Sequence, residues 1–328
     1  MSEYRYTFRK FLKDWMLIIS MICGASIYLV YHAIEPLHAA GPVLLAGVKV
    51  IQPLLLFLML FLSFCKIEPQ QMKPHGWMIW HLLVQCGLFA ILSLLLILFP
   101  DMKIAVPLEA AALCLICPTA TACAVVTGKL GGNMAAVVTY TVLINLAVAI
   151  VVPLIVPVMH PVEGLTFGVA FVKILAKVFP LLILPCLLAW LVRYLLPGIH
   201  AWLVERAGWS FYLWAVGLCL AILMSVRAII ASRAGVGLVL GIALASLLAC
   251  AFQFWIGKLI GRRYGSHVSA GQALGQKNTV FAIWMGYTFM TPITSVAGGF
   301  YSIWHNCYNT WQLYRKRKAD EAAAGQGC

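Results

Sequence analysis

Ten long apolar segments, separated by short charged stretches, constrain this chain more than any other feature of its sequence. A helix needs about 20 predominantly apolar residues to cross the hydrocarbon core of a membrane. Segments of that length lie at residues 15–34, 42–64, 77–99, 105–127, 134–159, 168–196, 210–231, 235–260, 268–290 and 292–313. Because the connections between them are short, the sequence predicts a single all-α polytopic membrane domain over residues 1–328.

Composition supports a membrane protein. Hydrophobic residues make up 63 % of the chain and charged residues only 10 %, whereas soluble domains are about 45–50 % apolar. The net charge of +13 comes from Lys and Arg in short loops and tails, not from a basic stripe interleaved with aromatic residues, so the expected partner is the lipid bilayer and not nucleic acid. The eleven cysteines lie mostly within apolar runs, and we interpret them as packing residues of a reduced chain.

The distribution of Lys and Arg predicts the orientation. With the N-terminus in the cytoplasm, most cations fall on the cytoplasmic side, as the positive-inside rule requires. The segments placed there carry Arg5, Arg9, Lys10, Lys13, Lys66, Lys73, Lys129, Arg193, Arg206, Lys258, Arg262, Arg263, Arg315, Lys316, Arg317 and Lys318. The first apolar segment lacks a small-residue cleavage site, so it is expected to be retained. Both termini are predicted to be cytoplasmic in an integral membrane protein.

Ten spans divide into two halves of five, here residues 1–160 and 161–318, with 319–328 as a cytoplasmic tail. An odd number of spans per half inserts the second half upside down relative to the first. Such inverted repeats are a transporter architecture, in which discontinuous helices meet at a binding site near the membrane midplane.

Each half carries one weakened span at its fourth position. In the first half Pro118 follows Cys117 and lacks the N–H that a helix needs. In the second half Gly275 stands directly before Gln276, Lys277 and Asn278. Irregular backbone at membrane depth is tolerated only where protein or a water-filled cavity satisfies it, so the paired breaks predict the binding site.

Three stretches carry a resemblance to a known family. These stretches are IQPLLLFLMLFLSFCKIEP at 51–69, CPTATACAVVT at 117–127 and GQKNTVFAI at 275–283. They resemble the bile acid:sodium symporter superfamily. The resemblance implies ten spans in a panel domain and a core domain, with spans 4 and 9 unwound and crossing in the core. It also implies sodium-coupled transport of organic anions, which include bile acids, other sterol conjugates and small carboxylates.

The sequence departs from the family where the family binds sodium. The Ser and Asn that the family carries in span 4 are Cys123 and Ala124 here, and the Glu and Gln of span 9 are Ala273 and Lys277. Of the family's oxygen ligands, those still matched are Gln85 and Thr141. Because a hard cation needs several oxygen ligands, most effectively with a carboxylate, neither sodium site is expected to survive as built.

Lys277 leads to the central hypothesis. It stands where the resemblance places the second sodium ion, so its ammonium is expected to serve as a tethered cation in that place. At ~1.5 Å per residue from Ser269 it lies ~12 Å into a ~30 Å core, too deep for easy snorkelling. Two roles stay open: a lysine that deprotonates during the cycle and couples transport to protons, or a fixed charge that holds the core or meets an anionic substrate. Sodium coupling through rebuilt ligands is a third alternative.

The remaining candidates lie beside the two breaks or near one end of the last span. Ion-site or coupling candidates are Lys277, Gln85, Thr141, Asn278 and Gln276; substrate or crossover candidates are Pro118, Thr119, Thr121, Cys123, Thr127, Gly275, Thr279 and Asn306. Glu109 is interpreted as a carboxylate in the outer headgroup region near a helix N-terminus, with a gate or a charge network as the alternative.

The sequence bears on three classes of function: a carrier of organic anions, a metalloid efflux carrier, and an enzyme or sensor. The favoured one is a secondary carrier for an organic anion that works by alternating access, with no cofactor. The alternative is metalloid efflux, because related transporters export arsenite with a span 4 cysteine, and Cys114, Cys117 and Cys123 stand in that span. An enzyme or a sensor is not expected, because the sequence shows no catalytic constellation and no cytoplasmic output domain.

Overall fold

The chain is described by a computed structural model that covers residues 8–66, 68, 70, 72–120, 122–161, 164–206 and 208–325. Within those residues the fold is all-helical apart from one isolated β-bridge. The elements are α1 Phe8–Ala33, η1 Glu35–Ala40, α2 Gly41–Cys65, α3 Gly76–Leu98, α4 Ala105–Ile116, α5 Cys123–Lys129, α6 Met134–Met159, α7 Phe167–Leu182, α8 Leu184–Leu195, α9 Pro197–Glu205, α10 Trp209–Ser232, α11 Val236–Arg262, α12 His267–Gly275, α13 Thr279–Phe289, η3 Pro292–Ser295 and α14 Val296–Gly325.

Helices occupy all of the predicted apolar segments, but not all of these helices have the length and hydropathy of a simple span. Five described helical segments are long and apolar enough to cross a membrane, and α7 with α8 gives a sixth if the bent pair is one span. Two other predicted segments are split, into α4 with α5 and α12 with α13. The structure is therefore that of an α-helical membrane protein whose remaining segments are interrupted or more polar.

One break was not predicted. The segment 168–196 was expected to be a continuous span, whereas its two helices, α7 and α8, meet at a bend of 40°. Pro180 lies inside α7, and Pro185 lies at the start of α8. Proline has no N–H to donate and its ring clashes with the carbonyl four residues earlier, which accounts for the bend.

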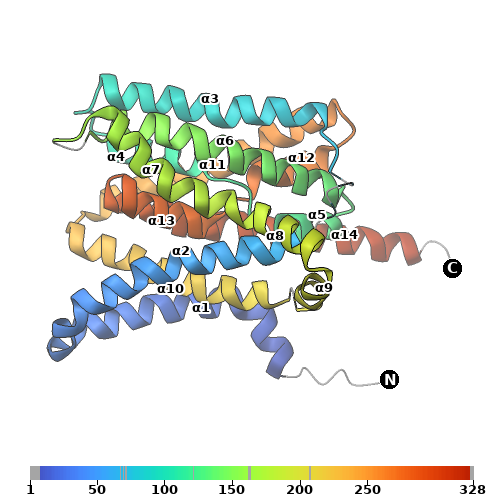
Figure 1. The fold of residues 1–328 in the computed structure, drawn as a ribbon, viewed down its shortest axis with the longest axis horizontal. Helices are drawn as coiled ribbons and strands as arrows, with labels where there is room; N and C mark the ends of the chain where they lie inside the picture. The colour runs from blue at the N-terminus through green and yellow to red at the C-terminus, as the bar shows by residue number, and fades with distance from the viewer. Residues whose placement is uncertain are drawn as a thin grey trace.

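The helices run side by side in two groups (Figure 1). α10 packs against both α1 and α2 along one side, with α8 against α2. α3, α4, α6, α11 and α12 form the other group, with α14 packed against α11 and α13. The start of α1 and the end of α14 lie at the same end of the bundle, together with α9. That arrangement agrees with an even number of crossings.

The contact between α1 and α10 depends on Gly24. A Cβ atom on Gly24 would lie 2.2 Å from the carbonyl oxygen of Cys219 in α10, so the helices can approach this closely only because the side chain is absent. Small residues at helix contacts allow such close backbone approach in membranes.

We expect Gly24→Ala to force α1 away from α10 and to lower the unfolding temperature of the purified protein in detergent. Gly47→Ala in α2 is the matched control, because a Cβ atom there meets nothing within 4 Å. In the control, the higher helix propensity of alanine should leave stability unchanged or slightly raised. Equal unfolding temperatures for the two variants would contradict the assigned contact between α1 and α10.

Candidate functional site

The first break separates α4 from α5. Cys117 is extended, with φ −51° and ψ 134°, as expected for a residue that precedes a proline. The carbonyl groups of Ile116 and Cys117 accept hydrogen bonds from Gln85 Nε2 at 3.1 and 2.8 Å. The predicted break at Pro118 is therefore present, and Gln85 satisfies the carbonyls that the helix end leaves free.

The second break separates α12 from α13. α12 ends at Gly275, Gln276 is extended, and the side chain of Asn278 caps α13 by accepting a hydrogen bond from Phe281 N at 3.2 Å. Gly275 is required by packing, since a Cβ atom there would lie 2.4 Å from the ring of Phe254 in α11. Here too the sequence located the break correctly.

The two breaks bind each other. Thr119 and Lys277 form an antiparallel β-bridge. Its hydrogen bonds run from Ala120 N to Gln276 O and from Asn278 N to Pro118 O, both at 2.9 Å. Thr119 adds a side-chain bond from Oγ1 to Ala273 O at 2.7 Å. Backbone groups that neither helix can satisfy are thus paired across the crossing, as a low-dielectric environment demands.

A Gln–Tyr pair supports each break. Beside α4, Tyr140 in α6 donates its hydroxyl to Gln85 Oε1 at 3.1 Å. Beside α12, Gln253 in α11 donates to the Tyr301 hydroxyl at 3.0 Å, and that hydroxyl donates to Gly275 O at 2.8 Å. These two bonds join α11, α14 and the end of α12. In each half a Gln–Tyr pair meets the end of the broken helix, through the Gln85 amide in the first half and through the Tyr301 hydroxyl in the second.

The loops after the breaks also match. Asn133, which starts α6, donates its backbone N–H to Ser269 Oγ in α12 at 2.7 Å. Thr291, which starts η3, donates its backbone N–H to Glu109 Oε1 in α4 at 2.8 Å. The sequence separation between Asn133 and Thr291 equals that between Thr119 and Lys277. The two halves therefore have corresponding contacts in corresponding positions.

Lys277 is buried at the crossing. Its side chain is 1 % exposed and its Nζ has no hydrogen-bond partner among the described residues. The ion pairs among the described residues involve the carboxylates of Glu68, Glu109, Glu205 and Asp320, and none of them includes Lys277. Its electrostatic neighbours include His81 and the thiols of Cys86, Cys114, Cys117 and Cys123. A cation taken out of water without a counter-charge is costly, so its presence needs an explanation in function or assembly.

A cavity of about 540 Å³ reaches the crossing from one side. Its walls are largely apolar, with Phe64, Val125 and Trp214 among the lining residues. Predicted site residues border it at the crossing and on the helices beside it: Thr141, Gln276, Lys277, Asn278, Thr279 and Asn306. Although Lys277 borders the cavity, its Nζ is shielded from it.

Other predicted residues lie outside the cavity wall. Cys123 and Thr127 are buried in α5, and Thr127 Oγ1 has no partner among the described residues. Thr121 lies outside the described residues. Cys114 and Cys117 are spaced as a C-x-x-C pair, but both thiols are free and buried. Thr141, in contrast, does line the cavity, and it donates its hydroxyl to Val137 O at 2.9 Å.

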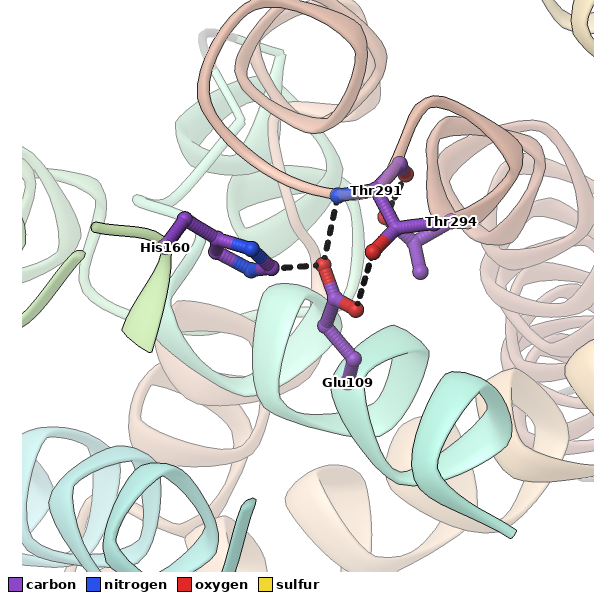
Figure 2. A network of polar contacts seen from close by, with 4 residues as sticks. All are labelled: Glu109, His160, Thr291 and Thr294. Carbon is purple, nitrogen blue, oxygen red and sulfur yellow. Dashed lines mark hydrogen bonds and ion pairs between the residues drawn. The ribbon is translucent and has the colours of Figure 1, made fainter. Parts of the chain in front are cut away.

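Of the interpretations offered for Glu109, the structure supports the alternative, a charge network, and not the favoured one. Instead of facing lipid headgroups, Glu109 is 5 % exposed and lies in a polar cluster (Figure 2). Its carboxylate accepts hydrogen bonds from Thr291 N and Oγ1, both at 2.8 Å, and lies 3.1 Å from His160 Nε2. Thr294 Oγ1 in turn bonds to Thr291 O. His160 and Thr291 were missed because they follow different helices, and local sequence does not reveal that they meet.

These features define an α-helical membrane protein of the transporter class, with two broken helices crossing beside a cavity. A family model, the Sodium Bile acid symporter family, matches residues 53–233, more than half of the chain. The chain belongs to this family, whose members are transmembrane transporters. The match covers α3 to α10 and ends before α12, so Lys277 lies outside it. No curated protein matches the chain.

We expect Tyr301→Phe to destabilise the protein, because it leaves Gly275 O and one donor of Gln253 without their partner. The loss should be about 1 kcal/mol, the usual size for such a bond in a membrane protein. Tyr314→Phe on the same helix is the control, since Tyr314 is 46 % exposed. Thermal unfolding of both variants in detergent gives the comparison. If Tyr301→Phe unfolds at the temperature of the control, the hydroxyl does not support the end of α12.

Proposed function

We propose that this chain is a secondary carrier of an organic anion that works by alternating access, with Lys277 in place of a bound cation. The observation that carries the proposal is the buried Lys277 Nζ, which has no hydrogen-bond partner among the residues that the structure describes. It lies at the crossing of two broken helices beside a cavity of about 540 Å³. The family supports transport of an organic anion. The substrate class includes bile-salt-like molecules and small carboxylates.

The architecture that we propose is ten spans in two inverted repeats, residues 1–160 and 161–318. Support comes from corresponding contacts in the two halves: one broken helix in each, one Gln–Tyr pair beside each break, and one loop bonded to the opposite half. In this arrangement α1, α2, α7, α8 and α10 form the panel domain, and the other spans form the core domain. Alternating access is then a movement of one group against the other.

The cavity is proposed to open to the cytoplasm. Lys66, Glu68, Gly208 and Ser210 line it away from the crossing. Lys66, Glu68 and Gly208 belong to connections that the positive-inside rule assigns to the cytoplasmic side, and Ser210 lies in the first turn of α10 beside one of them. At the opposite end of the broken helices, Glu109 ties α4 to the start of η3. These contacts support a state that is open inward and closed outward.

The chemistry at the inner end of the cavity suits an anion. The N-terminus of α13 meets the cavity at Asn278 and Thr279, and helix N-termini carry a partial positive charge and free N–H donors. The ammonium of Lys277 adds a full charge behind them. The apolar walls supply surface for the body of an amphipathic substrate. A carboxylate at the crossing with its apolar part along the cavity is the pose that we propose.

The residues at the crossing do not fit the sodium sites that the family name implies. Gln85 Oε1 accepts a bond from Tyr140, and its amide nitrogen binds two carbonyls. The Thr141 hydroxyl is donated within α6. The carboxylate of Glu109 is bonded to Thr291 at the start of η3, away from the bridge that joins the two breaks. A buried ammonium would also repel a second cation.

The test is uptake into proteoliposomes by the wild type and by Lys277→Gln, over a panel of bile salts and small carboxylates. We expect uptake by the wild type to be independent of sodium, and we expect Lys277→Gln to lose uptake. Lys173→Gln is the matched control, because Lys173 is exposed on α7. Monodisperse protein with retained helicity must be shown for each variant.

The pH dependence separates the two roles of Lys277. If the lysine releases its proton during the cycle, a pH gradient will drive wild-type uptake against a concentration gradient. If it stays charged, uptake will be downhill and insensitive to the gradient. Undiminished, pH-insensitive uptake by Lys277→Gln without sodium would remove the residue from the mechanism, and sodium-dependent wild-type uptake would require ion ligands other than those named.

The alternative of metalloid efflux has no structural support at the cavity. Cys114, Cys117 and Cys123 are each at most 1 % exposed, and none lines the cavity. A thiol-dependent route needs these sulfurs to meet the transported species. We therefore propose the organic anion and not a metalloid as the substrate.

A further inference from the structure

A second hollow, separate from the transport cavity, lies between α11 and α14. It has a volume of about 500 Å³ and shares no lining residue with the cavity at the crossing. Along α11 it is lined by Leu247, Ala251 and Trp255, and along α14 by Trp304 and Cys307. His305 and Asn306, the residues between these last two, face the other cavity instead. We call this hollow the α11–α14 groove.

Most of the α11–α14 groove is apolar and open. Leu247, Ala251 and Trp255 recur every four residues, which places them on one face of α11. Trp255 is 60 % exposed, and Leu244 and Leu248 beside this face are 56 % and 60 % exposed. On a helix that spans a membrane, such a face meets the acyl chains of lipids.

One end of the groove is cationic. Lys258 and Arg262 line it one turn apart, in the last two turns of α11. Among the described residues, neither forms an ion pair with a carboxylate. Lys258 Nζ is held by neutral groups, 2.9 Å from the Tyr308 hydroxyl and 2.6 Å from Gln312 Oε1. An ammonium has three donors, so one is left for a ligand.

Lys258 does not have the contacts of a cation that simply extends towards water. Instead of reaching for water, its ammonium lies 4.9 Å from the centre of the Tyr308 ring, and its stem packs on α12, where a Cβ atom on Gly271 would meet it at 2.5 Å. The charge is thus fixed beside an apolar trough, and no carboxylate of the described residues pairs with it. This combination fits a ligand with one anionic end and a long apolar body.

We propose that the α11–α14 groove binds an anionic phospholipid. The phosphate lies between Lys258 and Arg262, and one acyl chain lies along α11 towards Leu247. The distance from Lys258 to Leu247 along the helix is ~16 Å at ~1.5 Å per residue, about half of a ~30 Å hydrocarbon core. The positive-inside rule puts this end of α11 at the cytoplasmic leaflet, where anionic lipids are attracted to basic pockets between helices. Because α11 packs along α12, the bound lipid braces the half-helix that leads to Lys277.

The experiment compares thermal unfolding of the full chain in a non-ionic detergent with added phosphatidylglycerol or phosphatidylcholine of the same acyl chains. A ligand that binds the folded state raises its apparent stability. We expect phosphatidylglycerol to raise the unfolding temperature of the wild type by several degrees more than phosphatidylcholine does. The double variant Lys258→Gln/Arg262→Gln should lose most of that difference.

Two controls separate a built site from general attraction. Arg263→Gln removes the neighbouring cation, which does not line the groove, and should keep the full difference. Inorganic phosphate at the same concentration should give none, because the acyl chain contributes to binding. Full lipid-specific stabilisation in the double variant, or equal loss in Arg263→Gln, would overturn the proposal. A wild-type dimer that Trp255→Ala dissociates would also overturn the proposal, because a second copy of the chain would then occupy the groove.

Discussion

Two backbone hydrogen bonds, between the break that follows α4 and the break that follows α12, are the interaction on which the rest of the structure depends. A peptide group without a partner is costly inside a membrane, and each break frees groups that its own helices cannot satisfy. Two hydrogen bonds satisfy such groups in both breaks at once, one from Ala120 N to Gln276 O and one from Asn278 N to Pro118 O. Neither broken helix would be tolerated alone, so the crossing must form as a unit.

The buried ammonium follows from the same geometry. The bridge places Lys277 opposite Thr119 and turns its Nζ away from water. The family is named for sodium, and we propose that Lys277 supplies a covalently attached cation in place of a bound ion. A tethered charge cannot leave with the substrate, so the driving force must come from elsewhere. The proton and the substrate gradient are the two sources that the proposal retains.

The sequence could locate the breaks but could not identify what holds them. Pro118 lacks an N–H, and the stretch from Gly275 to Asn278 combines glycine with polar side chains, so both predict a break. The split helices confirm both positions. The bend between α7 and α8 was missed although Pro180 and Pro185 flank it, because each proline alone is tolerated in a membrane helix. The roles of Tyr140, Tyr301 and the Glu109 cluster depend on contacts between distant segments, which no local pattern contains.

We propose that Lys277 has replaced the bound cation, and the effect of sodium on the stability of the folded protein tests this most directly. Thermal unfolding of the purified wild type would be measured in sodium, potassium and choline chloride at equal ionic strength. We expect equal unfolding temperatures in all three salts, because the Lys277 ammonium already occupies the place of the bound ion. A rise that is specific to sodium, by mass action on the folded state, would show that an ion site persists and would contradict the account.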